Sequence, residues 1–99
     1  MSIRDDMCIL TKMHTFAEFI ANRSGDELGL KSPSKHFASK KVTHDRIRSY
    51  GFTLACILDY YTNMDFDEAV SEWNRSPQNT NRTRWSSSKW KEMIEFYID

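Results

Sequence analysis

Apolar side chains recur along this chain at intervals of three and four residues, the spacing that places them on one face of an α-helix. Only three glycines and two prolines interrupt the 99 residues, and no long run alternates apolar with polar residues as a half-buried strand would. Six phenylalanines, four tyrosines and three tryptophans supply enough apolar area for one compact core. We therefore predict an all-α fold, a small single-domain bundle of four to five helices over residues 1–99.

The helical spacing falls into five segments. We expect helices at residues 11–22, 34–41, 43–63 and 65–74, and a last helix that begins within the serines at 86–88. Asp65 and Glu68 have the spacing of a capping box at the start of the fourth helix. Gly51 lies within the longest helix, so either another element packs closely there or the helix bends.

The cysteines and the N-terminus indicate the compartment. Cys8 and Cys56 are the only cysteines, and we expect two free thiols, with Cys56 buried in its apolar run as a small hydrophobic residue. The N-terminus is acidic where a signal peptide would be basic, and no apolar stretch approaches the ~20 residues that span a bilayer. We expect a cytoplasmic protein without a membrane partner.

Charge is strongly segregated along the chain, although the net charge is zero. Residues 31–50 carry six basic and one acidic side chain, and residues 75–91 carry five basic and none acidic. If the fold brings these two stretches together, they form a positive surface that attracts nucleic acid. The alternative is that they pair with the acidic stretches in surface salt bridges.

The C-terminal third has a recognisable pattern. The segments DFDEAVSEWN at 65–74 and NRTRWSSSKWKEMI at 81–94 resemble the DNA-binding region of large serine recombinases. In that family a helix ends in an Asn-containing turn, and a connection rich in Thr, Arg and Gly leads to Trp-Ser or Trp-Thr, where the next helix begins. The family's turn glycines are replaced here by residues 76–79, and no catalytic domain fits beside the segment. The resemblance implies a helix-turn-helix-like unit at 65–98 that stands alone, as in a phage or mobile-element regulator or accessory factor.

These observations favour a small DNA-binding protein. Hydroxyls and amides at a helix start can approach phosphate closely, and lysine and arginine neutralise its charge. We predict DNA contacts from the following residues: Arg82, Arg84, Ser87, Ser88, Lys89 and Lys91, with Lys40 and Lys41 from the first basic stretch. Trp73, Trp85 and Trp90 are expected in the core, with Trp85 at its edge or against a ligand.

Two other classes of function are alternatives to DNA binding. A protein-binding module, such as a phage-encoded inhibitor or adaptor acting on a host or phage protein, would use the acidic surface or exposed aromatics such as Tyr60. Catalysis has little support, because His14, His36 and His44 lack zinc-site spacing and no nucleotide-binding glycine motif occurs. We expect no enzyme, no cofactor and no metal, and the sequence leaves a homodimer open.

Overall fold

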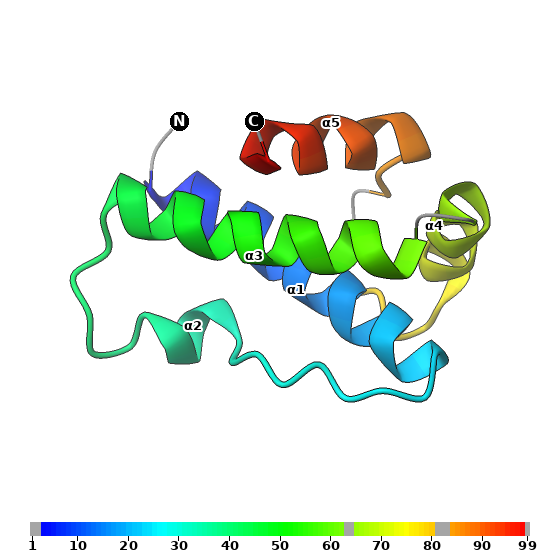
Figure 1. The fold of residues 1–99 in the computed structure, drawn as a ribbon, viewed down its shortest axis with the longest axis horizontal. Coiled ribbons are helices and arrows are strands. Elements are labelled where there is room, and N and C mark those ends of the chain that lie inside the picture. The colour runs from blue at the N-terminus through cyan, green and yellow to red at the C-terminus, as the bar shows by residue number, and fades with distance from the viewer. Residues whose placement is uncertain (1–2, 63–64, 81–83, 99) are drawn as a thin grey trace.

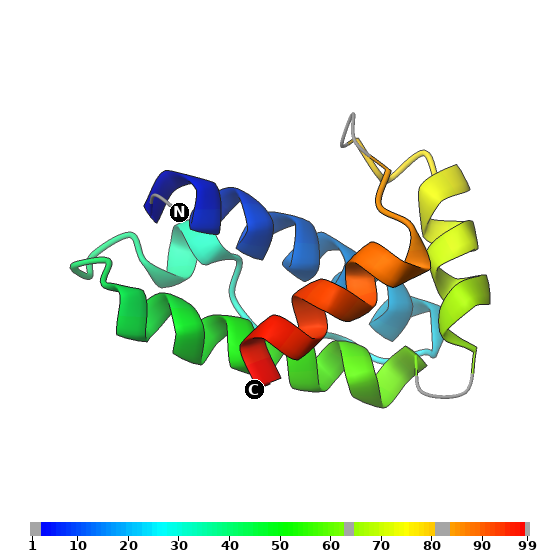
Figure 2. The same cartoon turned by 90° about the horizontal axis from the view of Figure 1, so that it is seen from above.

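A computed structural model describes residues 3–62, 65–80 and 84–98, which form five helices and contain no strand. The helices are α1 (Ile3–Arg23), α2 (Pro33–His36), α3 (His44–Thr62), α4 (Phe66–Arg75) and α5 (Ser87–Ile98). The predicted all-α fold with four to five helices is confirmed. Helices α1 and α3 form a central layer, with α5 on one face and α2 on the other (Figure 1). Helix α4 crosses one end of this layer (Figure 2).

Helix α1 begins at Ile3, eight residues before the predicted start at residue 11. Asp5 and Asp6 lie in its first turn, where carboxylates stabilise the positive end of the helix dipole. The predicted stop after residue 22 is confirmed. Gly25 adopts a φ of 83°, and the Asp26 N–H donates to the carbonyl of Ala21 at 2.9 Å, which is the Schellman arrangement.

Helix α2 is a single turn, so the prediction of a helix over residues 34–41 was wrong. Pro33 occupies its first position, where the fixed φ of proline suits a helix start. The helix ends at His36, and the buried ring of Phe37 anchors the turn that follows. The residues up to the start of α3 are therefore a connection and not a helix.

Helices α3 and α5 meet at Gly51. A Cβ atom placed on this glycine would lie 2.3 Å from Cδ1 of Tyr97, so the tyrosine ring occupies the space that a side chain would need. The expected close packing at Gly51 is confirmed. The inward face of α5 is made by Trp90, Met93, Ile94 and Tyr97, which are all buried, and the expected core position of Trp90 is confirmed.

The two predicted caps of α4 and α5 have different outcomes. Asp65 makes no side-chain capping bond, so the capping box was wrong. Its carboxylate instead lies 3.4 Å from the guanidinium of Arg23, which also contacts Glu72 at 2.8 Å and joins α1 to α4. At α5 the Oγ of Ser86 accepts from the backbone N–H of Lys89 at 3.3 Å, so the serine cap is confirmed.

A helix-turn-helix-like unit at 65–98 is not confirmed. Helices α4 and α5 are separated by residues 76–86, whereas a helix-turn-helix joins its helices by a turn of about three or four residues. Helix α5 packs mainly against α3 and only slightly against α4. The start of α5 is therefore positioned by α3.

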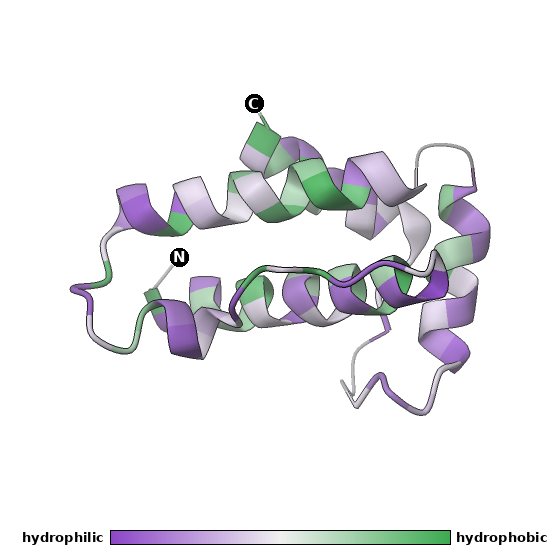
Figure 3. Ribbon diagram, turned by 60° about the horizontal axis from the view of Figure 1, so that its bottom comes forward, coloured by the Kyte–Doolittle hydropathy of each residue, from purple (hydrophilic) through white to green (hydrophobic). Residues whose placement is uncertain are grey.

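Aromatic rings hold the centre of the fold. Phe16 is fully buried between Trp90 and Trp73, with ring centroids 4.6 and 5.9 Å away. Trp85 is half-buried and covers the core edge, 4.7 Å from the Trp90 centroid, whereas Tyr60 is 78% exposed. Figure 3 shows the hydrophobic positions of α1 and α3 turned toward one another.

The two thiols are free, but their environment differs from the prediction. Cys8 and Cys56 are both exposed. Cys56 lies on the outer side of α3, because the buried stripe of that helix passes through Ala55 and Leu58 and successive helical residues point about 100° apart. Among the described residues, no helix has the length and apolar character needed to span a membrane.

Candidate nucleic-acid interface

The elements that carry the two basic stretches lie on different faces of the fold, although Arg48 of the first stretch lies 5.4 Å from the Phe96 ring on α5. The first includes α2 and the start of α3, and α2 lies on one face of the α1–α3 layer (Figure 1). The described part of the second includes the start of α5, on the opposite face (Figure 1). The expectation of one positive surface made by both stretches is thus overturned, because α5 docks on the far side of α3.

The predicted C-terminal contacts are dispersed and engaged with neighbours. Arg82 lies outside the described residues. The Nε of Arg84 donates to the Asn74 carbonyl at 3.1 Å. The Lys89 ammonium lies 3.9 Å from a Glu92 carboxylate oxygen, and the Lys91 ammonium lies 5.5 Å from the centre of the Phe66 ring. Ser87 is half-buried and Ser88 exposed in the first turn of α5. That these residues contact DNA stays a prediction.

From the first basic stretch, Lys40 and Arg46 line one groove of about 280 Å³ between α3 and the turn after α2. We call this cavity the basic groove. It is lined by Leu30, His36, Lys40, Arg46, Ser49, Tyr50 and Thr53. Two cations line it, and none of the lining residues is acidic. Of the predicted contacts, Lys40 lies in this groove, and Lys41 is exposed next to it in the chain.

Helix geometry explains the α3 wall of the basic groove. Ser49 and Tyr50 lie three and four residues after Arg46, and Thr53 lies four and three residues after them, so these residues share one side of α3. The hydroxyl of Thr53 donates to the Ser49 carbonyl at 3.1 Å, and no described atom is hydrogen-bonded to the Ser49 hydroxyl. This wall therefore presents a guanidinium and a free hydroxyl side by side.

The opposite wall is held by aromatic packing. The imidazole of His36 lies 4.9 Å from the Tyr50 ring and 4.8 Å from the Phe37 ring, measured between centroids. Phe37 is buried and also contacts Tyr50, at 5.6 Å. The short α2 is thus fixed on α3, and Lys40 follows in the turn directly after it.

Hydrogen bonds fix the connection between α1 and α2 beside the groove. The Tyr50 hydroxyl donates to the carbonyl of Lys31. His14 is buried on α1, with Nε2 3.1 Å from the carbonyl of Leu30 and Nδ1 3.0 Å from a carboxylate oxygen of Glu18. Both ring nitrogens of His14 face acceptors, so the imidazole ties this connection to α1.

The charges of the basic groove act on its histidine and tyrosine. Burial lowers the pKa of His36 below its usual 6.5, and the positive charges of Lys40, Lys31 and Arg46 lower it further. Burial, followed by the negative charge of Glu18, raises the pKa of Tyr50. His36 is therefore neutral at pH 7, and three cations surround it without a carboxylate in the groove to compensate them.

Part of this site was accessible from the sequence. Lys31, His36 and Arg46 belong to the basic stretch that was identified, but only Lys40 and Lys41 were selected as contacts. Ser49 and Thr53 were missed, although their helical spacing from Arg46 indicated a common face. Tyr50 is buried in the core and also lines the groove.

The structure is a small all-α fold with a groove that two cationic side chains line and no carboxylate lines. Comparisons with models of protein families, with curated proteins and with solved structures gave no match to this chain. The resemblance to the recombinase DNA-binding region therefore stays a prediction. Within the part of the chain that the structure describes, no three His, Cys, Asp or Glu side chains gather as metal ligands would.

Proposed function

We propose that this protein binds nucleic acid by placing a backbone phosphate in the basic groove, and that DNA is the leading candidate for this ligand. In this role it would act as a small regulator or accessory factor of the kind that phages and mobile elements encode. One observation carries the proposal. Lys40 and Arg46 line one groove that no carboxylate lines, and beside burial the charges of Lys40, Lys31 and Arg46 lower the pKa of His36 within it.

The donors of the groove suit a phosphate group. The guanidinium of Arg46 can form two parallel hydrogen bonds to phosphate oxygens, and the ammonium of Lys40 contributes a point charge. The Ser49 hydroxyl and a neutral His36 N–H add uncharged donors on opposite walls. Such contacts position a nucleic-acid backbone without reading its sequence.

Further cations extend the surface beyond the groove. Lys31 lies in the connection before α2, Lys35 on α2 and Lys41 in the connection after it; all three are exposed, and none forms an ion pair with a described residue. Several exposed cations match the repeated charge of a polynucleotide better than that of a single small anion. This favours a nucleic-acid backbone as the ligand.

Electrophoretic mobility shift with a short DNA duplex, repeated over a series of salt concentrations, tests the proposal. If about three phosphates are neutralised, the logarithm of affinity should fall with that of salt with a slope of about −2.7, or about 40-fold between 50 and 200 mM. The double variant Lys40→Gln/Arg46→Gln should reduce the slope to about −0.9. Duplexes of different sequence should bind alike.

Lys89→Gln is the matched control, because it removes one positive charge from α5 and leaves the basic groove intact. Its slope should equal that of the unmodified protein. Absence of binding at the lowest salt would remove the proposal. A reduced slope in Lys89→Gln with an unchanged slope in the double variant would move the contact to α5.

A further inference from the structure

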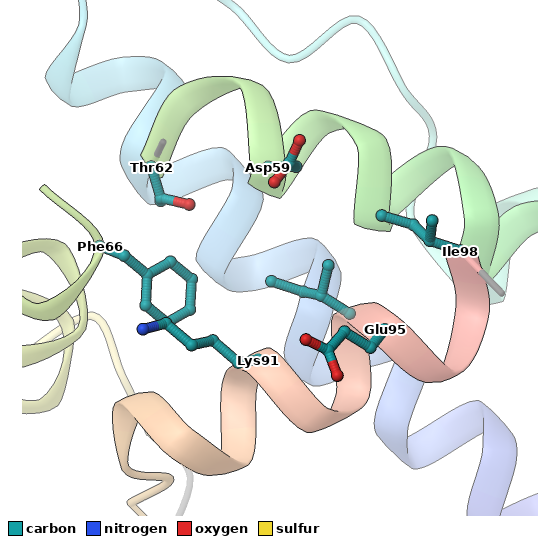
Figure 4. A pocket seen from close by; sticks show the side chains of 7 residues that line it. Asp59, Thr62, Phe66, Lys91, Glu95 and Ile98 are labelled. Atoms are coloured by element: carbon teal, nitrogen blue, oxygen red, sulfur yellow. The ribbon is translucent and has the colours of Figure 1, made fainter. Parts of the chain in front are cut away.

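A second groove, of about 290 Å³, lies at the other end of α3, between that helix, the start of α4 and α5. We call it the acidic groove and define it by the carboxylates of Asp59 and Glu95, the apolar side chains of Phe66, Ile94 and Ile98, and Lys91. Figure 4 shows Asp59 on the α3 wall and Glu95 on the α5 wall, with Phe66 at one end and Ile98 at the other. The groove therefore combines an apolar floor with one carboxylate on each side.

Neither carboxylate is compensated inside the described structure. Asp59 and Glu95 are exposed and form no ion pair or side-chain hydrogen bond with any described residue. The single cation of the groove, Lys91, is four residues from Glu95 on α5, but its ammonium is turned toward the Phe66 ring, 5.5 Å from the ring centre (Figure 4). The groove has a net negative charge and room between its walls.

The surroundings increase this negative potential. Residues 51–74 carry five acidic and no basic side chains. Arg23 pairs with Asp65 and Glu72, whereas Asp67 and Glu68 are exposed in the first turn of α4 without an ion pair to a described residue. A surface of this kind attracts cations and repels nucleic acid.

We propose that the acidic groove binds an arginine side chain of a partner protein. The methylene stem of arginine would lie on Ile94 and Ile98, and its planar guanidinium would donate to Asp59 and Glu95 on the two walls. This site is independent of the proposed nucleic-acid site, because it lies at the opposite end of α3 and has the opposite charge.

The chemistry of the lining residues favours arginine over other cations. A lysine ammonium is a compact charge, whereas the flat guanidinium presents donors in two directions and can bridge two carboxylates. A divalent metal ion would need more oxygen ligands than two carboxylates at the edge of an apolar floor supply. The apolar floor also requires a ligand with an apolar stem.

The test is a methyl NMR titration with the blocked dipeptide acetyl-Leu-Arg-methylamide, compared with acetyl-Leu-citrulline-methylamide, which has the same shape but no charge. The arginine dipeptide should shift the methyl signals of Ile94 and Ile98 saturably, and the citrulline dipeptide should bind at least about tenfold more weakly. Glu95→Gln should weaken binding of the arginine dipeptide about tenfold. Glu92→Gln, which changes the same charge one turn earlier and outside the groove, should leave binding unchanged.

Each other outcome overturns the proposal. Equal binding of both dipeptides, or equal binding to Glu95→Gln and Glu92→Gln, would mean that the carboxylates do not select a cation. Two results together would assign the groove to a second copy of this chain. The methyl signals would shift with protein concentration in the absence of dipeptide, and sedimentation would detect dimers that the Asp59→Asn variant no longer forms. Mobility shift of DNA by Glu95→Gln is the independent readout, because the proposed nucleic-acid function should be unaffected by this variant.

Discussion

The two grooves of this molecule are built from the same helix but in different ways. The basic groove uses residues between Leu30 and Thr53, so its parts are neighbours in sequence, and only the short α2 has to dock on α3. The acidic groove joins Asp59 to Phe66 and to Ile98 at the C-terminus, and it forms only when α4 and α5 are both in place. The comparison teaches that a net charge of zero can conceal two surfaces of opposite sign at the two ends of one helix.

This difference makes the acidic groove the more dependent of the two on tertiary packing. At Gly51 α5 packs closely on α3, and the Tyr97 ring fills the space that a side chain would need. The basic groove contains no residue of α5. A change at the α3–α5 contact should therefore separate the two sites.

The largest effect is expected for Gly51→Ala. The new methyl group would overlap the Tyr97 ring, and overpacking of this kind costs about 3 kcal/mol. For a domain of this size that corresponds to a fall in Tm of about 12–24 °C in thermal unfolding. Below the new Tm, binding of the arginine dipeptide should be lost first, whereas DNA binding should persist.

Gly29→Ala is the matched control for this variant. No described atom lies within 4 Å of a Cβ at this position, and its φ is not in the left-handed region. The free energy of unfolding should change by less than about 1 kcal/mol. Equal destabilisation by both variants would show that the close approach of α5 to Gly51 does not hold the fold.

A smaller effect is expected on the basic-groove side from His14→Leu. This change leaves the Leu30 carbonyl and the Glu18 carboxylate without their partner, which costs about 2 kcal/mol in urea unfolding. The exposed Thr11 makes only a local bond to the Met7 carbonyl, so Thr11→Ala should change stability by about 0.5 kcal/mol or less. Similar values for the two variants would mean that His14 does not tie the α1–α2 connection in place.

The pH dependence of the basic groove follows from His36, whose folded-state pKa is lowered by burial and by Lys40, Lys31 and Arg46. The unfolded chain therefore binds a proton at this residue at a higher pH than the folded protein does. Its contribution to stability is fully present above pH 6.5 and is lost as the pH falls through 6.5 toward the folded-state pKa.

Proton NMR titration of the His36 ring measures this pKa directly. Lys40→Gln should raise it toward 6.5, and DNA bound in the basic groove should raise it as well, because phosphate offsets the neighbouring cations. Lys89→Gln should leave it unchanged, since Lys89 lies on α5 and does not line the groove. An unchanged pKa in Lys40→Gln would contradict the convergence of cations on His36.

The smallest effect is expected for Cys56→Ser. This thiol is exposed on the outer side of α3, so the change should alter the free energy of unfolding by no more than about 0.5 kcal/mol. Ala55→Ser places a hydroxyl at the adjacent, fully buried position and should cost about 1–3 kcal/mol. A larger loss of stability in Cys56→Ser than in Ala55→Ser would contradict the assignment of Ala55 to the buried face of α3.

Features that depend on local spacing were predictable from the sequence. The inward face of α5, the serine cap before it and the extent of α3 all follow from three- and four-residue periodicity and from residues that cap a helix. The start of α1 was missed, because its acidic first turn resembled a polar terminus although Asp5 and Asp6 suit a helix dipole.

Features that depend on distant partners were not predictable in this way. The carboxylate of Asp65 pairs with Arg23, 42 residues earlier, and so does not cap its own helix. The separation of the two basic stretches results from α5 docking on the far face of the α1–α3 layer (Figure 1). Charge segregation in the sequence thus indicated two cationic segments, but only tertiary packing decides which of them forms a groove.

The central claim is that nucleic acid binds at the basic groove and not at the start of α5. Backbone amide NMR with a short DNA duplex at about 50 mM salt tests it most directly, because the electrostatic contacts are strongest there. The proposal predicts that the largest shift changes fall within residues 31–53, with Lys40, Arg46 and Ser49 among them. Changes centred on residues 87–91, with residues 31–53 unaffected, would contradict it.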